Sequence, residues 1–144
     1  MSGTLTWYGN GLLKLATGSI DLDTDTFKAM LCTSAYTPNQ DTHTFRSDVT
    51  NEITGTGYTA GGATLSGVSV TYDSASNQVR ISWTDPTWAS ATFTARTLVI
   101  YKSRGGAASA DELVAFATEA SDITATGATF TVDLPSPTLT ITAS

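Results

Sequence analysis

Short stretches of alternating apolar and polar residues dominate the second half of the chain. Val79, Ile81 and Trp83 occupy every second position of residues 78–84, which is the period of a strand with one buried face. Residues 92–101 predict a longer strand, whose apolar second half suits the centre of a sheet. Further strands are predicted over residues 64–72, 112–117, 128–133 and 138–142. Short strands separated by turns indicate a mainly β protein, an antiparallel β-sandwich or a jelly-roll-like barrel.

The first half of the chain predicts one short N-terminal helix and one strand. Residues 8–19 carry an apolar stripe of Leu and Ala, with Asn10 as a candidate N-cap and Gly18 as a terminator. A helix of about two turns depends on tertiary packing for its stability. Residues 27–33 are mostly apolar and predict a strand, and residues 45–49 predict a single helical turn.

The length of the chain predicts one β-sandwich domain over residues 1–144. A chain of this size builds one core, and no linker or sustained repeat divides it. Residues 1–8 precede the predicted helix and are expected to form an N-terminal arm. Residues 34–62 are rich in turn-forming residues and are expected to form a long loop region. Because loops on a rigid sandwich often carry function, we expect both segments to contact a partner.

Threonine takes the place of charged residues on the polar faces of the predicted strands. Charged residues make up 14% of the chain, against about a quarter in an average domain, and threonine makes up roughly one residue in five. A hydroxyl surface loses less side-chain entropy and less ion hydration on docking than a surface of Lys and Glu. The composition therefore either follows from the high strand content or marks a surface that docks onto another protein.

The charge balance argues against nucleic acid as a direct partner. The net charge is −6, and the seven Lys and Arg residues do not cluster in the sequence. Binding to a phosphate backbone requires a basic patch. The N-terminus lacks the features of a signal peptide, and no apolar run is long enough to cross a bilayer. We therefore expect a protein that is made in the cytoplasm, stays soluble and has no membrane partner.

No combination of residues predicts a catalytic centre. The glycine-rich residues 55–62 lack the Gly-Lys-Ser/Thr ending of a phosphate loop and are interpreted as a conformationally demanding loop. His43, the single histidine, lies beside Asp41 and Asp48 and is interpreted as a hydrogen-bonded structural residue. Cys32, the single cysteine, lies in an apolar run and is expected to be buried. We expect a protein that is not an enzyme and uses no cofactor.

Asp21, Asp23 and Asp25 form the carboxylate cluster of the sequence. Their spacing matches the first three ligands of an EF-hand loop, but Thr26 and Cys32 stand where that loop has Gly and Glu. In an extended segment the three carboxylates would share one face. We expect them to face solvent or a basic partner, with a bound cation as the alternative.

Aromatic side chains near turns are the candidates for contact with a partner. Trp83 follows Val79 and Ile81 at every second position, on the same face of the predicted strand, and is expected in the core. Trp88 follows the break at Asp85-Pro86, and Trp7 and Tyr8 precede the helix, an unusual place for two large aromatics unless they dock onto something. Exposed aromatics also stack on sugar rings. The predicted partner interface comprises Trp7, Tyr8, His43, Phe45, Tyr58 and Trp88.

An ordered series of motifs extends over roughly residues 9–103. The series comprises Asn10-Gly11 to Leu15, residues 20–28, Thr42-His43-Thr44-Phe45, residues 48–52, residues 55–62, Asp85-Pro86-Thr87-Trp88, Ala95-Arg96 and Ile100-Tyr101. In this order the motifs resemble a family of small tailed-bacteriophage virion proteins, whose members look like capsid cement or decoration proteins. Such proteins are small β-sandwich or jelly-roll proteins that sit as oligomers on an icosahedral shell and bridge its major capsid subunits.

The resemblance implies a structural protein of the virion, located on the capsid surface. Its expected partner is the major capsid protein, and a homo-oligomer, either a dimer or a trimer, would match the symmetry axes of the shell. The resemblance brings no enzymatic residues with it. The alternative is a tail- or fibre-associated module that recognises host glycan through exposed aromatics.

Overall fold

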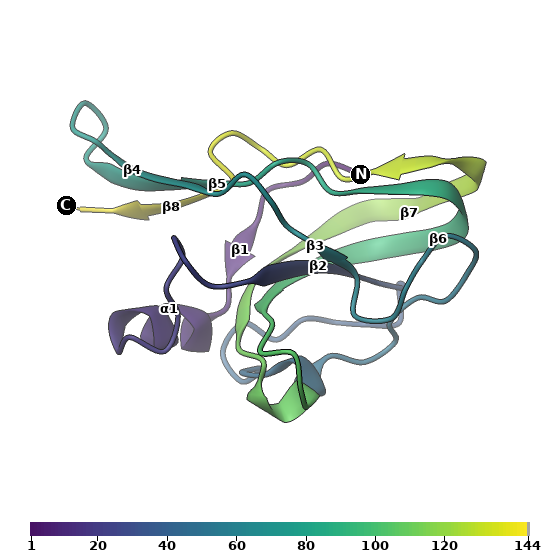
Figure 1. Cartoon of the computed structure of the whole chain (residues 1–144), viewed down its shortest axis with the longest axis horizontal. Helices are drawn as coiled ribbons and strands as arrows, with labels where there is room; N and C mark the ends of the chain where they lie inside the picture. Colours follow the sequence, from purple (N-terminus) through teal and green to yellow (C-terminus); the bar gives the residue numbers. More distant parts are fainter. Residues whose placement is uncertain (144) are drawn as a thin grey trace.

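Two antiparallel sheets and one helix make up the computed structural model, which describes residues 1–143 (Figure 1). The large sheet has the strand order β1-β7-β6-β2-β3, and the small sheet has the order β4-β5-β8. The elements are β1 (Thr6–Trp7), α1 (Gly9–Ala16), β2 (Phe27–Cys32), the 3-10 turn η1 (Arg46–Asp48), β3 (Ala63–Thr64), β4 (Ser69–Asp73), β5 (Gln78–Ser82), β6 (Thr87–Lys102), the 3-10 turn η2 (Ala108–Ala110), β7 (Leu113–Thr131) and β8 (Leu139–Thr142). The predicted mainly β fold with one short helix is confirmed, and the described residues form a sandwich-like pair of sheets rather than a closed barrel.

The main core lies between the inner faces of the two sheets. Phe27, Leu98 and Ile100 of the large sheet belong to one buried cluster with Ile81 and Leu139 of the small sheet. Trp83 is also buried in this cluster, as predicted from its position in phase with Val79 and Ile81.

The outer face of the large sheet is covered over only half of its length. A second buried cluster on that face joins Met30, Val99 and Tyr101 to Tyr8 and Tyr36, which come from outside the sheet. The loop region between β2 and β3 therefore packs onto the sheet. The buried thiol of Cys32 belongs to the same cluster, as its apolar neighbours predict.

The burial pattern of β6 changes along the long hairpin that it forms with β7. Residues 92–95 alternate between exposed and buried side chains, whereas residues 97–101 are all buried. The pairing with β7 is irregular between Ala95 and Thr97, where the alternation shifts. Beyond that point both faces of the strand are covered, which explains the continuous apolar run that predicted a central position.

Two predicted strands are one strand in the structure. Residues 112–117 and 128–133 both belong largely to β7, which runs from Leu113 to Thr131 without leaving the sheet. The polar residues between them read as a loop in the sequence. They stay paired with β6 through an irregular stretch, in which Thr97 lies opposite Thr118 and Ala95 lies opposite Ile123.

Residues 64–72, predicted as one strand, contribute to both sheets. β3 pairs with β2 in the large sheet, and β4 pairs with β5 in the small sheet. Gly67, which has a φ of +64°, lies between them. A Cβ at this position would overlap the Thr84 hydroxyl, so glycine allows the chain to cross from one sheet to the other.

Helix α1 forms where the apolar stripe predicts it, but with a different N-cap. The N-cap is Tyr8, whose side chain makes no capping bond, and Asn10 lies inside the first turn. The Asn10 amide instead donates to the Thr44 hydroxyl at 2.9 Å. Gly18 follows the helix with a φ of +84°, as predicted for its terminator. Among residues 1–143, no helix has the length and apolar character needed to cross a bilayer.

Candidate partner interface

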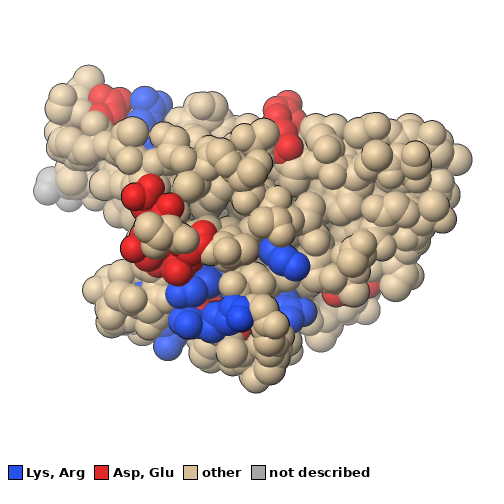
Figure 2. Space-filling model, in the orientation of Figure 1, with Lys and Arg blue, Asp and Glu red and all other residues tan. Residues whose placement is uncertain are grey.

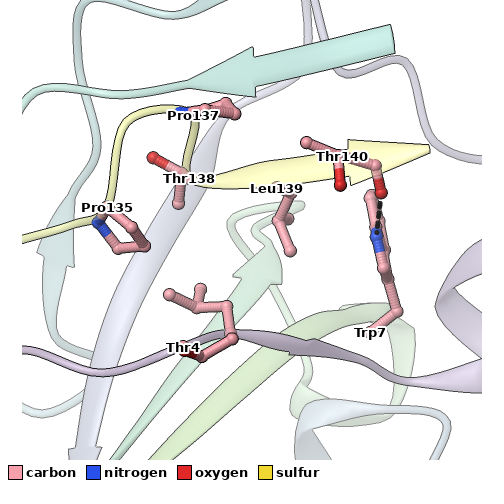
Figure 3. Close-up of a pocket in the computed structure, with 8 residues that line it drawn as sticks. Thr4, Trp7, Pro135, Pro137, Thr138, Leu139 and Thr140 are labelled. Atoms are coloured by element: carbon pink, nitrogen blue, oxygen red, sulfur yellow. Dashed lines mark hydrogen bonds between the residues drawn. The ribbon is translucent and has the colours of Figure 1, made fainter. Parts of the chain in front are cut away.

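Residues 1–8, which were expected to form an N-terminal arm, are built into the fold. Thr6 pairs with Phe116 in the large sheet. Tyr8 is fully buried, so it cannot meet a partner. The partly buried Trp7 donates its indole N–H to the Thr140 carbonyl at 3.1 Å and so connects β1 of the large sheet to β8 of the small sheet (Figure 3). The burial of Tyr8 depends on residues distant in the sequence, which no local pattern reveals.

A pocket of about 220 Å³ lies beside Trp7, between the N-terminal segment and residues 135–140 (Figure 3). Its walls include Thr4, Leu139 and two prolines. Since the lining carries no acidic or basic side chain, it offers no general acid or base for catalysis.

Trp88 and Tyr58 belong to an aromatic cluster on the inner side of the large sheet. Trp88 is 5% exposed. Its ring meets Phe93 and Phe130 edge-on, with centroids 6.5 and 6.1 Å away, and stacks against Tyr58 at 6.1 Å. The prediction that Trp88 contacts a partner was wrong, because β6 begins at Thr87, directly after the Asp-Pro break, and directs Trp88 into the core.

Glu52 fixes the glycine-rich loop against β2. Its carboxylate accepts hydrogen bonds from the Tyr58 hydroxyl at 2.8 Å and the Gly61 N–H at 2.6 Å. Burial is the main cause that raises the pKa of Tyr58, and Glu52 adds to it. Gly62 has a φ of +81°, and a Cβ there would overlap the Ala29 carbonyl. The glycines thus allow the loop to approach β2 closely, in agreement with the interpretation of a conformationally demanding loop.

His43 is held by hydrogen bonds within the loop region. Its Nδ1 lies 3.0 Å from the Tyr36 hydroxyl and accepts the Asn39 N–H at 3.3 Å. The Tyr36 hydroxyl also bonds to the buried Tyr8 hydroxyl at 2.8 Å. Phe45 is partly buried nearby. His43 therefore lies with Tyr8, Tyr58 lies with Trp88, and Trp7 lies beside Thr140. The six predicted interface residues do not form a single surface.

The three aspartates form a turn rather than the extended segment that was expected. The Asp21 carboxylate accepts the N–H groups of Asp23 and Thr24, and these bonds, with one from the Thr24 side chain as the largest cause, lower the pKa of Asp21. Asp25 pairs with Lys102 at 2.7 Å. Within residues 1–143 no group of three or more His, Cys, Asp or Glu side chains is placed to hold a metal ion.

Basic residues that are scattered in the sequence gather at the end of the large sheet near α1 and η2 (Figure 2). Each of three cations in this region has a carboxylate partner. Arg46 lies 2.8 Å from the buried Asp111, and Arg104 lies 2.7 Å from the buried Glu112. Lys102 pairs with a third carboxylate. Since these three charges are compensated, they are poorly suited to binding a phosphate backbone.

The uncovered half of the outer face of the large sheet carries a regular array of threonines. Thr92 lies opposite Thr126, and Thr94 lies opposite Thr124. Thr56 of the loop region forms a bridge with Thr92 from the other side. All five side chains are exposed, and the hydroxyls of Thr94 and Thr124 are 2.8 Å apart. We call these five residues the threonine face.

The threonine face is rigid and uncharged. The inner side of the same strands carries Phe93 and Ala125, which are buried in the main core beside the aromatic cluster. The ion pair of Arg96 and Asp122, at 2.8 Å, follows in the next row along the strands. Because Thr is stiff at χ1, the array has little side-chain entropy to lose when another surface covers it. The high threonine content of the sequence is consistent with an uncharged hydroxyl surface. The position of that surface follows from which half of the large sheet the loop region covers, and this is not visible in the sequence.

Comparison with known proteins found no matching family model, no matching curated protein and no matching solved structure.

Proposed function

We propose that the protein is a structural virion protein that binds the assembled capsid shell of a tailed bacteriophage and stabilises it, as a cement or decoration protein does. The observation that carries the proposal is the threonine face, a rigid and uncharged surface left open on one half of the large sheet. The motif series over roughly residues 9–103, which resembles small phage virion proteins, supplies the biological setting.

The energetics of docking favour such a face. Immobilising a flexible side chain at an interface costs about 0.5–1.5 kcal/mol, and the short threonine side chains avoid most of this cost. Their hydroxyls both donate and accept hydrogen bonds, so they can pair with polar groups of another surface. A protein that binds only the assembled shell stabilises that state. Many copies multiply the effect of a modest contact, and a dimer or trimer would match the symmetry axes of the shell.

Cosedimentation with capsid shells tests the proposal. The purified protein is mixed with shells that lack it and, separately, with unassembled major capsid protein. We expect it to sediment with the shells and to leave the unassembled subunits unbound. Failure to sediment with shells at any protein concentration would contradict the proposal.

Two matched variants test whether the threonine face makes the contact. Thr94→Lys places a charge in the middle of the face, whereas Thr142→Lys places the same charge at an exposed threonine at the end of β8. We expect Thr94→Lys to reduce shell occupancy and Thr142→Lys to retain it. Equal occupancy for the two variants would place the contact elsewhere on the molecule.

The number of copies per virion separates the proposal from the tail or fibre alternative. A cement protein is present at a level comparable to the major capsid protein, and a tail module at a small fraction of it, so densitometry of purified virions distinguishes them. The glycan-binding version of the alternative relied on exposed aromatics. Trp88 is buried and the indole N–H of Trp7 is bound to Thr140, so neither of these two tryptophans presents a free ring and indole N–H to a sugar.

A further inference from the structure

One face of the small sheet is entirely apolar. Residues directly opposite each other in antiparallel strands share a face. By this rule, the pairs of Val70 with Ile81, Tyr72 with Val79, and Val79 with Ile141 lie on one side of the sheet. The complete set is Val70, Tyr72, Val79, Ile81, Leu139 and Ile141.

The rest of the protein covers only part of this face. Ile81 and Leu139 are buried in the main core. Val79 and Ile141, nearer the outer end of the sheet, are partly buried, and Tyr72 is 59% exposed. The outer ends of β4, β5 and β8 extend beyond the large sheet and lie across a gap from α1 (Figure 1). The apolar face therefore continues past the body that covers its inner end.

A groove of about 440 Å³ separates this overhanging face from the end of α1 and the turn that follows it. Val70, Val79 and Ile141 line the side formed by the sheet. Leu15, Ile20 and Leu22 are the apolar lining residues of the opposite side. Exposed apolar patches, especially those rimmed by polar residues, mark interaction sites and binding grooves.

Carboxylates form the rim of the groove. Asp21 and Asp23 are exposed and belong to its lining, and acidic residues gather in the gap between the small sheet and α1 (Figure 2). Within residues 1–143, Asp23 forms no ion pair, whereas the neighbouring Asp25 is paired with Lys102. The rim thus carries negative charge that is available to a basic group.

The charge of the rim selects among possible occupants. In a two-fold dimer whose axis passes through the groove, the acidic rims of the two copies would face each other, and in a cyclic trimer the groove would meet another surface of the same acidic chain. The net charge of −6 adds to that repulsion. A segment with aliphatic side chains for the two walls and Lys or Arg for the rim satisfies both features.

We infer that the groove holds a segment of the major capsid protein that carries aliphatic side chains for the two walls and at least one Lys or Arg for the rim. The inference rests on the proposed function, because that function identifies the source of the segment. It adds a contact distinct from the threonine face, since the groove is bordered by the small sheet and α1, whereas the threonine face lies on β6 and β7.

Photo-crosslinking on capsid shells tests the occupant directly. Tyr72→p-benzoylphenylalanine places the reactive group at the exposed end of the apolar face, and Thr71→p-benzoylphenylalanine places it on the opposite face of the same strand. We expect position 72, and not position 71, to crosslink to a basic aliphatic segment of the major capsid protein. A crosslink from position 72 to a second copy of this chain, or none while the protein stays bound to shells, would overturn the inference and leave the proposed function standing. Loss of shell binding by the unmodified protein would overturn both.

Two pairs of variants measure the contributions of the rim and the wall. Asp23→Lys reverses a rim charge, with Asp41→Lys as a control at another exposed aspartate. Val79→Thr introduces a hydroxyl into the wall at nearly constant volume, with Val68→Thr as a control outside the groove. We expect the groove variants to weaken shell binding about 2- to 5-fold each, with unchanged unfolding midpoints for the aspartate pair. Equal binding of a groove variant and its control would count against the inference.

Discussion

Replacing Trp88 with alanine tests whether this side chain stabilises the core or meets a partner. The ring is 5% exposed and contacts Tyr58, Phe93 and Phe130. A buried aromatic side chain hides about 150–250 Å², which corresponds to about 4–6 kcal/mol at about 25 cal/mol per Å². The alanine retains part of that burial and the neighbours relax into the cavity. We therefore expect Trp88→Ala to lower the free energy of unfolding by about 3–5 kcal/mol.

Urea unfolding measures this loss, with the fluorescence of Trp7 and Trp83 as the signal in the variant. A loss of this size is a large part of the about 5–15 kcal/mol that stabilises a typical domain, so a shift of the midpoint will be evident. Trp88→Phe keeps an aromatic ring in the cluster and serves as the control, with an expected loss of about 1–2 kcal/mol. A loss below about 1 kcal/mol for Trp88→Ala would refute the assignment of Trp88 to the core.

Three further predictions concern the loop region and the buried thiol. Gly62→Ala should lower the free energy of unfolding by about 2–4 kcal/mol, because Gly62 has a positive φ and lies against β2. Gly105 also has a positive φ but has open space around it, so Gly105→Ala should cost about 1 kcal/mol. Equal costs of the two variants in urea unfolding would disprove this explanation. Hydrogen bonds from the backbone N–H groups of Phe45 and Thr44 lower the pKa of Asp48 in the folded state, so its contribution to stability is present above the unfolded pKa and disappears as the pH falls through the folded pKa. Asp48→Asn should accordingly lose less stability than the wild type between about pH 5 and pH 2, and parallel melting curves would argue otherwise. Burial raises the pKa of the Cys32 thiol to about 12, so we expect no reaction with an aromatic disulfide reagent at neutral pH until urea unfolds the chain, and rapid reaction of the native protein would show that the thiol is accessible.

Local patterns in the sequence predict which face of a strand is apolar, and the fold follows from them to a large extent. The alternation of Val79, Ile81 and Trp83 places them correctly on the inner face. The apolar run at the end of β6 correctly predicts burial on both sides. These outcomes depend on properties of single strands, which the sequence encodes within a few residues.

The positions that were predicted incorrectly depend on contacts between distant residues. Tyr8 is buried because its hydroxyl meets Tyr36, which is 28 positions away. Trp88 is buried because β6 starts one residue before it, and an error of one residue in the phase of a strand reverses the side to which a side chain points. Pattern alone reads an aromatic residue beside a turn as exposed in both cases.

The sequence likewise does not predict that the threonine face and the groove are exposed. The threonines of the threonine face and the apolar residues of the groove are evident in the sequence as alternating positions. Whether a face is covered depends on how far the loop region and α1 extend across the sheets, which is a property of the assembled fold. Thr94 is exposed because the loop region stops short of it, and Tyr72 is exposed because β4 extends beyond the body.

The bond between Trp7 and Thr140 also has a consequence for how the chain folds. Its two partners are 133 residues apart. In addition, β1 can pair only after β7 has been synthesised, and the third strand of the small sheet is β8, near the end of the chain. Domains dominated by such non-local pairing fold in about milliseconds to seconds, because the chain loses the entropy of loop closure before the stabilising contacts form. The sheets therefore cannot close until residues 113–142 have left the ribosome. Each new copy passes through a period with unpaired strand edges, during which chaperones and local concentration determine whether it folds or aggregates.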